Sequence, residues 1–148
     1  MTKLASDTRS VIVERELPHA PQKVWRALTE SPLIEDWLMK NDFQPRRGHK
    51  FTFRAEPQPY WNGVTDCEVL EIEPPRLLSY SWNSSGAEAA NGVKTIVTWT
   101  LTPTGSGTLL RMEQSGFRPD QDNNYQGAHY GWPKFIAGLE RTVAGLGD

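Results

Sequence analysis

The residue types that most often perform acid–base, nucleophilic or metal chemistry are few in this sequence and lie far apart. The three histidines are His19, His49 and His129, and none belongs to an HxH or HExxH pattern. The single cysteine, Cys67, has no partner for a CxxC pair or an intramolecular disulfide. Metal sites and thiol chemistry depend on such closely spaced groups. We therefore expect no metal ion, no cofactor and no catalytic residue set.

The acidic residues give the same indication. Glu35, Asp36, Asp120 and Asp122 lie in polar segments that we expect to be exposed to solvent. A carboxyl group becomes a general acid or base when its surroundings shift its pKa, and an exposed segment does not shift it. The sequence also lacks the glycine-rich phosphate loops and the GxSxG elbow of common nucleotide-binding and hydrolytic enzymes.

Aromatic residues form the more informative set. Six tryptophans occur among the 148 residues, and aromatic residues make up 10% of the chain. They could fill an ordinary core or line a ligand pocket, because pockets are rich in aromatic side chains. Gln114 is the polar candidate for such a pocket, since it continues the inward face of Leu110 and Met112 on a predicted strand. A buried amide needs a hydrogen-bond partner, which either the protein or a ligand supplies.

Composition limits the class of protein. The net charge of −2 shows no basic excess for nucleic acid, and no apolar run of about 18 residues predicts a membrane span. The N-terminus lacks the apolar segment of a secretory signal, and a lone cysteine fits a reducing compartment, so we expect a cytoplasmic protein. A chain of this length corresponds to one domain. We assign it to residues 10–148, after a flexible tail of residues 1–9.

Helical periodicity is strongest near the C-terminus. Over residues 124–146, large apolar residues recur at steps of three and four, which predicts one long amphipathic helix. Gly131 and Pro133 lie inside this segment, so we expect a bend there. A bent helix need not touch a curved sheet along its whole length, and the gap is the expected position of a cavity.

The rest of the chain favours strands and two short helices. Proline at the first helical turn is favoured, so Pro21 and Pro32 each mark the start of a short helix, the second ending near Trp37. Alternating or β-rich patterns predict strands. These strands cover residues 11–17, 48–54, 64–73, 77–82, 95–102 and 109–114. The third of them does not alternate cleanly, which indicates a β-bulge.

Five segments carry a resemblance to a known family. They are APQKVWRALTESPLIEDW at 20–37, VLEIEPPRLLSYSW at 69–82, TIVTWTLTP at 95–103, GTLLRMEQSGF at 107–117 and YGWPKFIAGL at 130–139. In this order they resemble the SRPBCC (START-like) superfamily, which includes polyketide cyclases, and within it the activator of heat-shock protein 90 ATPase homologues. The resemblance implies an α+β helix-grip (START-like) fold. In that fold a curved antiparallel sheet of about six or seven strands grips a long C-terminal helix, and two short helices follow the first strand.

The resemblance also implies a ligand-binding site, because elements that carry aromatic residues converge on a cavity in this fold. We expect the cavity mouth near Trp37, the loop at Tyr60 and Trp61, and Tyr130. The expected cavity residues are Trp37, Phe53, Trp61, Tyr80, Trp82, Trp99, Met112, Gln114, Tyr130 and Phe135.

Three functions follow as hypotheses. The first is binding of a small hydrophobic, aromatic or lipid-like molecule, with a link to stress responses. The second is a co-chaperone-like module whose partner is a chaperone, and the third is a cyclase-type enzyme that polarises a ketone through Gln114, Tyr80 or His129. The expected partners are thus a small hydrophobic ligand or a chaperone, without nucleic acid or a membrane span, for a monomer or weak homodimer.

Overall fold

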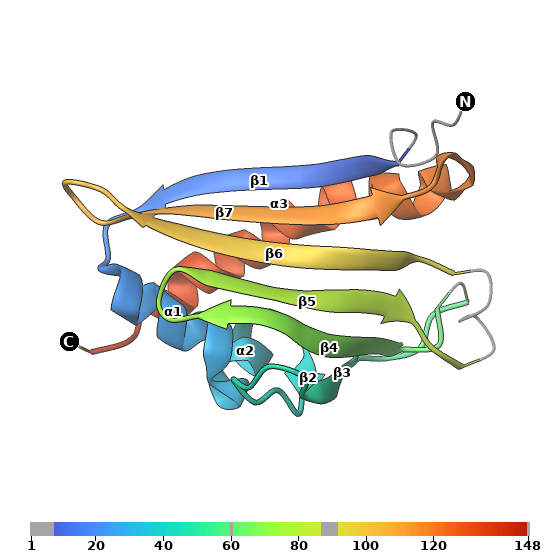
Figure 1. Cartoon of the computed structure of the whole chain (residues 1–148), viewed down its shortest axis with the longest axis horizontal. Coiled ribbons are helices and arrows are strands. Elements are labelled where there is room, and N and C mark those ends of the chain that lie inside the picture. The colour runs from blue at the N-terminus through green and yellow to red at the C-terminus, as the bar shows by residue number, and fades with distance from the viewer. Residues whose placement is uncertain (1–7, 60, 87–91, 148) are drawn as a thin grey trace.

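A seven-stranded antiparallel sheet organises the protein (Figure 1). The computed structural model describes residues 8–59, 61–86 and 92–147. Its strands are β1 (Arg9–Leu17), β2 (Lys40–Asn41), β3 (Lys50–Arg54), β4 (Val64–Glu73), β5 (Leu77–Ser84), β6 (Lys94–Pro103) and β7 (Thr108–Phe117). Their order across the sheet is β1-β7-β6-β5-β4-β3-β2, so the first strand pairs with the last.

Helices cover one face of this sheet. The two short ones, α1 (Pro21–Thr29) and α2 (Ser31–Trp37), each have proline in the first turn, as predicted. A short 3-10 turn, η3 (Pro119–Gln121), leads into α3 (Asp122–Ala144). Figure 1 shows α3 running across the sheet, with α1 and α2 near its C-terminal end. The predicted α+β helix-grip architecture is confirmed. Among the described helices, none has the length and apolar character needed to cross a bilayer.

The strand patterns place the core as expected. On β6, Thr95, Val97, Trp99 and Leu101 are all buried against the helices. Trp99 pairs with Leu78 on β5 and with Met112 on β7, so the inward face continues across three strands. The outward-facing Thr98 is half-buried rather than fully exposed, because strands pair with β6 on both sides.

Two finer predictions had different outcomes. The expected bulge in β4 is present as a shift of register between Val69 and Glu71. The proposed tail of residues 1–9 ends too late, since Arg9 already belongs to β1 and pairs with Phe117. Residues 1–7 of that tail lie outside the described residues.

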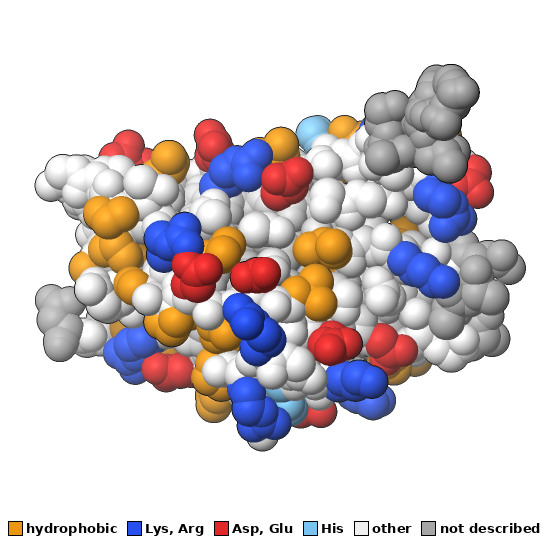
Figure 2. Space-filling model, in the orientation of Figure 1, with side chains coloured by type: hydrophobic (Ala, Val, Ile, Leu, Met, Phe, Trp, Pro, Cys, Tyr) orange, Lys and Arg blue, Asp and Glu red, His pale blue; other side chains and the backbone are white. Residues whose placement is uncertain are grey.

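The outer face of the sheet is mixed in character. Figure 2 shows acidic and basic side chains interspersed there with scattered hydrophobic ones. Arg111, for example, lies 3.5 Å from a carboxylate oxygen of Glu14 and 3.1 Å from one of Glu113. The functional cavity must therefore be sought on the other side, between the sheet and α3.

Candidate ligand-binding pocket

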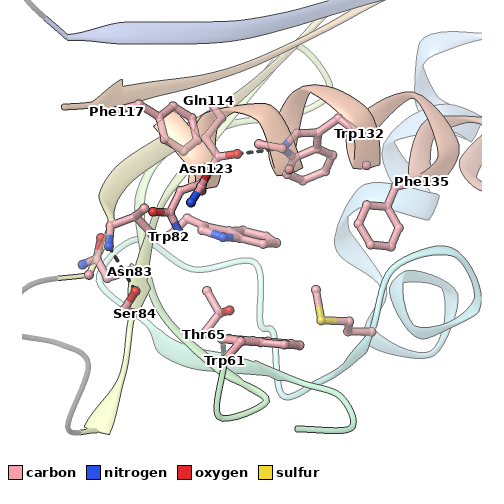
Figure 3. A pocket seen from close by; sticks show the side chains of 17 residues that line it. Trp61, Thr65, Trp82, Asn83, Ser84, Gln114, Phe117, Asn123, Trp132 and Phe135 are labelled. Atoms are coloured by element: carbon pink, nitrogen blue, oxygen red, sulfur yellow. Dashed lines mark hydrogen bonds between the residues drawn. The ribbon is translucent and has the colours of Figure 1, made fainter. Parts of the chain in front are cut away.

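A pocket of about 960 Å³ lies between the sheet and the N-terminal half of α3 (Figure 3). Residues from α3, from the ends of β4, β5 and β7, and from the neighbouring loops surround it. They are Met39, Trp61, Thr65, Trp82, Asn83, Ser84, Gly92, Val93, Gln114, Phe117, Asn123, Asn124, Gly127, Ala128, Gly131, Trp132 and Phe135.

Small residues on α3 explain why the space is not filled. Gly127, Ala128 and Gly131 all face the pocket from the helix. A Cβ atom added at Gly127 would meet no atom within 4 Å, and one added at Gly131 would meet only the ring of Phe135, at 4.0 Å. The backbone of α3 therefore borders the open space directly. The structure shows α3 as one helix through Pro133, so the proline does not divide it, and a bend there stays a prediction.

Aromatic rings form much of the pocket wall. Trp132 on α3 lies 5.3 Å from Trp82 on β5 and 5.7 Å from Phe135, measured between ring centroids. Trp61, in the loop before β4, donates its indole hydrogen to the carbonyl oxygen of Val64 at 3.1 Å, which fixes the ring at the pocket. Figure 3 shows these four rings around the open space. Such a wall suits a flat, apolar ligand.

A chain of hydrogen bonds joins two of these aromatic residues through buried polar side chains. The indole Nε1 of Trp132 donates to Oε1 of Gln114 at 2.7 Å, and Nε2 of Gln114 donates to Oγ1 of Thr95 at 2.9 Å. Thr95 then donates to the backbone oxygen of Trp82 at 2.7 Å. The partner expected for a buried Gln114 is therefore supplied at least partly by the protein.

Four of the ten residues predicted for the cavity line this pocket: Trp61, Trp82, Gln114 and Phe135. Five others are buried in the adjoining core and do not reach the pocket surface. They are Trp37, Phe53, Tyr80, Trp99 and Met112.

Tyr130 lies outside the pocket. Its side chain is 69% exposed and contacts Lys134, whose Nζ atom lies 3.9 Å from the ring centroid. The predicted mouth is corrected accordingly, since Trp37 is buried, Tyr130 faces solvent and only Trp61 is at the pocket. Tyr60, the fourth residue of that prediction, lies outside the described residues.

Sequence reasoning missed several lining residues. Trp132 falls on the apolar face of the helix pattern, and Phe117 ends the last strand, so both were visible as apolar positions but not as pocket positions. Met39 lies between α2 and β2 and carries no periodic signal. Gly127 was the clearest available signal, because it lies four positions before Gly131 and two glycines at that spacing border each other on a helix and leave space there.

The described lining of the pocket is electrically neutral. Among the described residues that line it, none carries a formal charge and none is histidine, cysteine or tyrosine. His129 is exposed and stacks on Tyr125 instead. The part of the chain that the structure describes also contains no cluster of three or more His, Cys, Asp or Glu suited to a metal ion.

Two titratable groups are buried in the core nearby. Loss of hydration on burial raises the pKa of the Tyr80 hydroxyl, against a smaller opposing effect of the hydrogen bond from Trp99. Burial likewise raises the pKa of the Cys67 thiol, and the charge of Asp66 adds to this. Both groups are uncharged at neutral pH. The arrangement can bind a neutral molecule, and the lining residues that the structure describes include no histidine, carboxylate or amine as a general acid or base.

Comparison with protein families gives one match over most of the chain. The family described as Activator of Hsp90 ATPase homolog 1-like protein matches residues 18–144. No curated protein matches the sequence significantly.

Solved structures show the same fold. Protein MLL2253 from Mesorhizobium loti is 54% identical, with a TM-score of 0.85, over 92% of this chain and 97% of that protein. CalU16 from Micromonospora echinospora is 23% identical, with a TM-score of 0.74, over 93% of this chain and 78% of its own. DynU16, described as a protein in the dynemicin biosynthetic locus, is also 23% identical, with a TM-score of 0.77, over 92% of this chain and 47% of its own. At this lower identity the last two show the fold alone.

Proposed function

This chain belongs to the family of Activator of Hsp90 ATPase homolog 1-like proteins, and on that premise we propose that its pocket binds a small, uncharged, largely aromatic molecule. The fold of this family commonly binds hydrophobic ligands. The described pocket residues include no histidine, cysteine or charged side chain that could act as an acid or a base, or activate the hydroxyl of Thr65 or Ser84, which favours a binding role over catalysis.

One observation carries the proposal: a neutral pocket walled by aromatic rings. Its volume of about 960 Å³ lies at the upper end of the range usual for small-molecule sites. Trp61, Trp82, Trp132, Phe117 and Phe135 supply aromatic surface from four different parts of the chain. A charged ligand would lose its hydration without gaining a charged partner, so the site favours a neutral one.

Two alternatives have less support. A chaperone-binding module needs an exposed apolar patch, but the large hydrophobic side chains exposed in the described residues are Ile12, Ile96 and Tyr130. Ile12 on β1 and Ile96 on β6 are separated by β7, and Tyr130 lies on α3. A cyclase would need polar catalytic groups inside the pocket, where of its three candidates only Gln114 is present.

The test is to close the pocket without disturbing the fold. In the parent protein, a panel of neutral aromatic compounds should raise the melting temperature and quench tryptophan fluorescence. The variant Gly131→Leu places a side chain in the empty space and should lose both responses. Gly105→Leu, the same substitution in a turn with open space around it, should keep them.

Native mass spectrometry of freshly purified protein adds an independent measurement. A bound small molecule that is present in the parent and absent from Gly131→Leu would support the proposal. If no compound changes the melting temperature or the fluorescence, and no small molecule copurifies, the pocket is not a binding site for this class of ligand.

A further inference from the structure

The orientation of the Gln114 amide is determined by the chemistry of its partners. An indole nitrogen can donate a hydrogen bond but cannot accept one. The atom 2.7 Å from Nε1 of Trp132 must therefore be the amide oxygen, and the amide nitrogen must face Thr95. The hydroxyl of Thr95 accepts from that nitrogen and donates to a backbone oxygen, which can only accept. The donors and acceptors of these three linked hydrogen bonds are therefore fixed, from the indole of Trp132 to the backbone oxygen of Trp82.

One hydrogen of Gln114 is left over. A primary amide nitrogen carries two hydrogens, and within the described residues Nε2 makes one hydrogen bond, to Thr95. Gln114 is only 2% exposed and lines the pocket. A buried N–H group without an acceptor is rare in proteins, whereas a carbonyl oxygen that uses one of its two lone pairs is ordinary. What Gln114 lacks is therefore an acceptor for the second hydrogen on Nε2.

Trp82 supplies a second free donor in the same space. Its ring lies in the pocket beside that of Trp132 (Figure 3), and its indole N–H has no hydrogen bond among the described residues. The hydroxyl of Thr65, also on the pocket wall, can donate as well as accept. Asn123 and Asn124 are exposed at the rim, where their amides are open to solvent.

We infer that the ligand of this pocket is an aromatic compound bearing a hydrogen-bond acceptor, such as a carbonyl or ether oxygen, which accepts from the side-chain amide of Gln114. This inference rests on the proposed function, since it names the class of ligand for the same pocket. Gln114 then acts as the residue that distinguishes acceptor-bearing aromatic molecules from pure hydrocarbons of the same shape.

A pair of matched probes tests the inference. 2-Acetylnaphthalene and 2-isopropenylnaphthalene have the same ring system and nearly the same shape, but only the first has a carbonyl oxygen. The dissociation constant of each is measured by quenching of tryptophan fluorescence, in the parent protein and in Gln114→Met. The ratio of the two constants is compared between proteins, because the difference in hydration of the probes then cancels.

The preference for the ketone should fall about tenfold in Gln114→Met, which is the loss expected for one hydrogen bond to a buried donor. Gln126→Met, the same substitution at an exposed position of α3 that does not line the pocket, should keep the parent ratio. If Gln114→Met leaves the ratio unchanged while both probes bind, the inference is overturned and the proposed function stands. If neither probe binds the parent, the proposed function fails and the inference fails with it.

A second measurement does not depend on the variant folding. In ¹⁵N-labelled parent protein, 2-acetylnaphthalene should move one of the two side-chain amide protons of Gln114 downfield, and saturating 2-isopropenylnaphthalene should not. Equal shifts with both probes, or no shift with the ketone at saturation, would overturn the role assigned to Gln114.

Discussion

The two halves of α3 face the same sheet, but one half fills the space above it and the other leaves a pocket. In the C-terminal half, Ile136, Leu139 and Val143 are each 0% exposed and fill the space above the sheet. In the N-terminal half, Gly127 and Gly131 leave a pocket of about 960 Å³. The helix is continuous between them, so side-chain volume rather than a break in the backbone separates core from pocket.

The short helices strengthen this difference. Near the C-terminal half, α2 packs against α3, and a Cβ atom added at Gly138 would be in van der Waals contact with Cβ of Trp37, at 3.4 Å. Trp37 is held by a hydrogen bond from its indole nitrogen to the carbonyl oxygen of Ala27 on α1, at 2.8 Å. The two glycines thus have different surroundings in one helix, since Gly138 lies against Trp37 and Gly131 borders open space.

The largest expected effect contrasts a core tryptophan with a pocket tryptophan. Trp99 is 0% exposed, packs edge-to-face on Trp37 and Trp132 and donates to the hydroxyl of Tyr80 at 3.0 Å. Trp99→Ala should lower the free energy of unfolding by about 3–5 kcal/mol, measured by urea denaturation. Trp61→Ala should lower it by only about 1 kcal/mol, because that ring is half-buried at the pocket. Equal losses would mean that the pocket is as tightly packed as the core.

A second contrast uses the same substitution in the two halves of α3. Gly138→Leu should destabilise the protein by about 1–3 kcal/mol, because the new side chain must displace Trp37. Gly131→Leu should cost little stability, since it enters open space, but it should abolish ligand binding. Thermal unfolding and ligand titration of both variants separate the two effects. Strong destabilisation by Gly131→Leu would show that the space is not available.

A third contrast concerns pH. Burial raises the pKa of the Cys67 thiol above its ordinary value of 9.0, so the folded protein keeps this proton in a pH range where the unfolded chain loses it. Stability from this group is complete below pH 9 and is lost as the pH rises further, by about 1 kcal/mol between pH 9 and 10. Cys67→Ala should reduce the slope of unfolding free energy against pH in this range.

Ligand binding should behave differently, because no titratable side chain is found among the described lining residues. The affinity for 2-acetylnaphthalene should therefore be constant between pH 6 and pH 8. A change in affinity across that interval would require a titrating group in contact with the ligand and would contradict a neutral pocket.

The smallest expected effect is a gain in stability. Gly131→Ala adds a methyl group that meets only the edge of Phe135, at 4.0 Å, and it replaces the residue that is least favourable in a helix apart from proline. The free energy of unfolding should rise by about 0.5–1 kcal/mol. A loss of stability, measured by urea denaturation, would indicate that the backbone at Gly131 is not regular helix.

Local pattern determined most of the fold. Proline at the start of α1 and α2, the alternation of β6 and β7 and the period of α3 depend on neighbours in the chain, and each predicted element is present. Alternation alone also placed Trp99, Met112 and Gln114 on the inner face, where all three are buried. These predictions succeeded because side-chain direction along a strand or helix follows from backbone geometry.

The position of the pocket depends on contacts between residues that are distant in the sequence. On α3, Tyr130 and Trp132 are only two positions apart, and the rotation of the helix against the sheet turns Trp132 inward and leaves Tyr130 in solvent. The two partners of Gln114 are Trp132 on α3 and Thr95 on β6, and no spacing in the sequence could reveal those pairs. Hydrophobic patterning along the chain is enough to assign the apolar faces. Where two such faces meet closely, and where small residues keep them apart, depends on side-chain volumes summed over elements that are distant in the sequence and meet only in the folded protein.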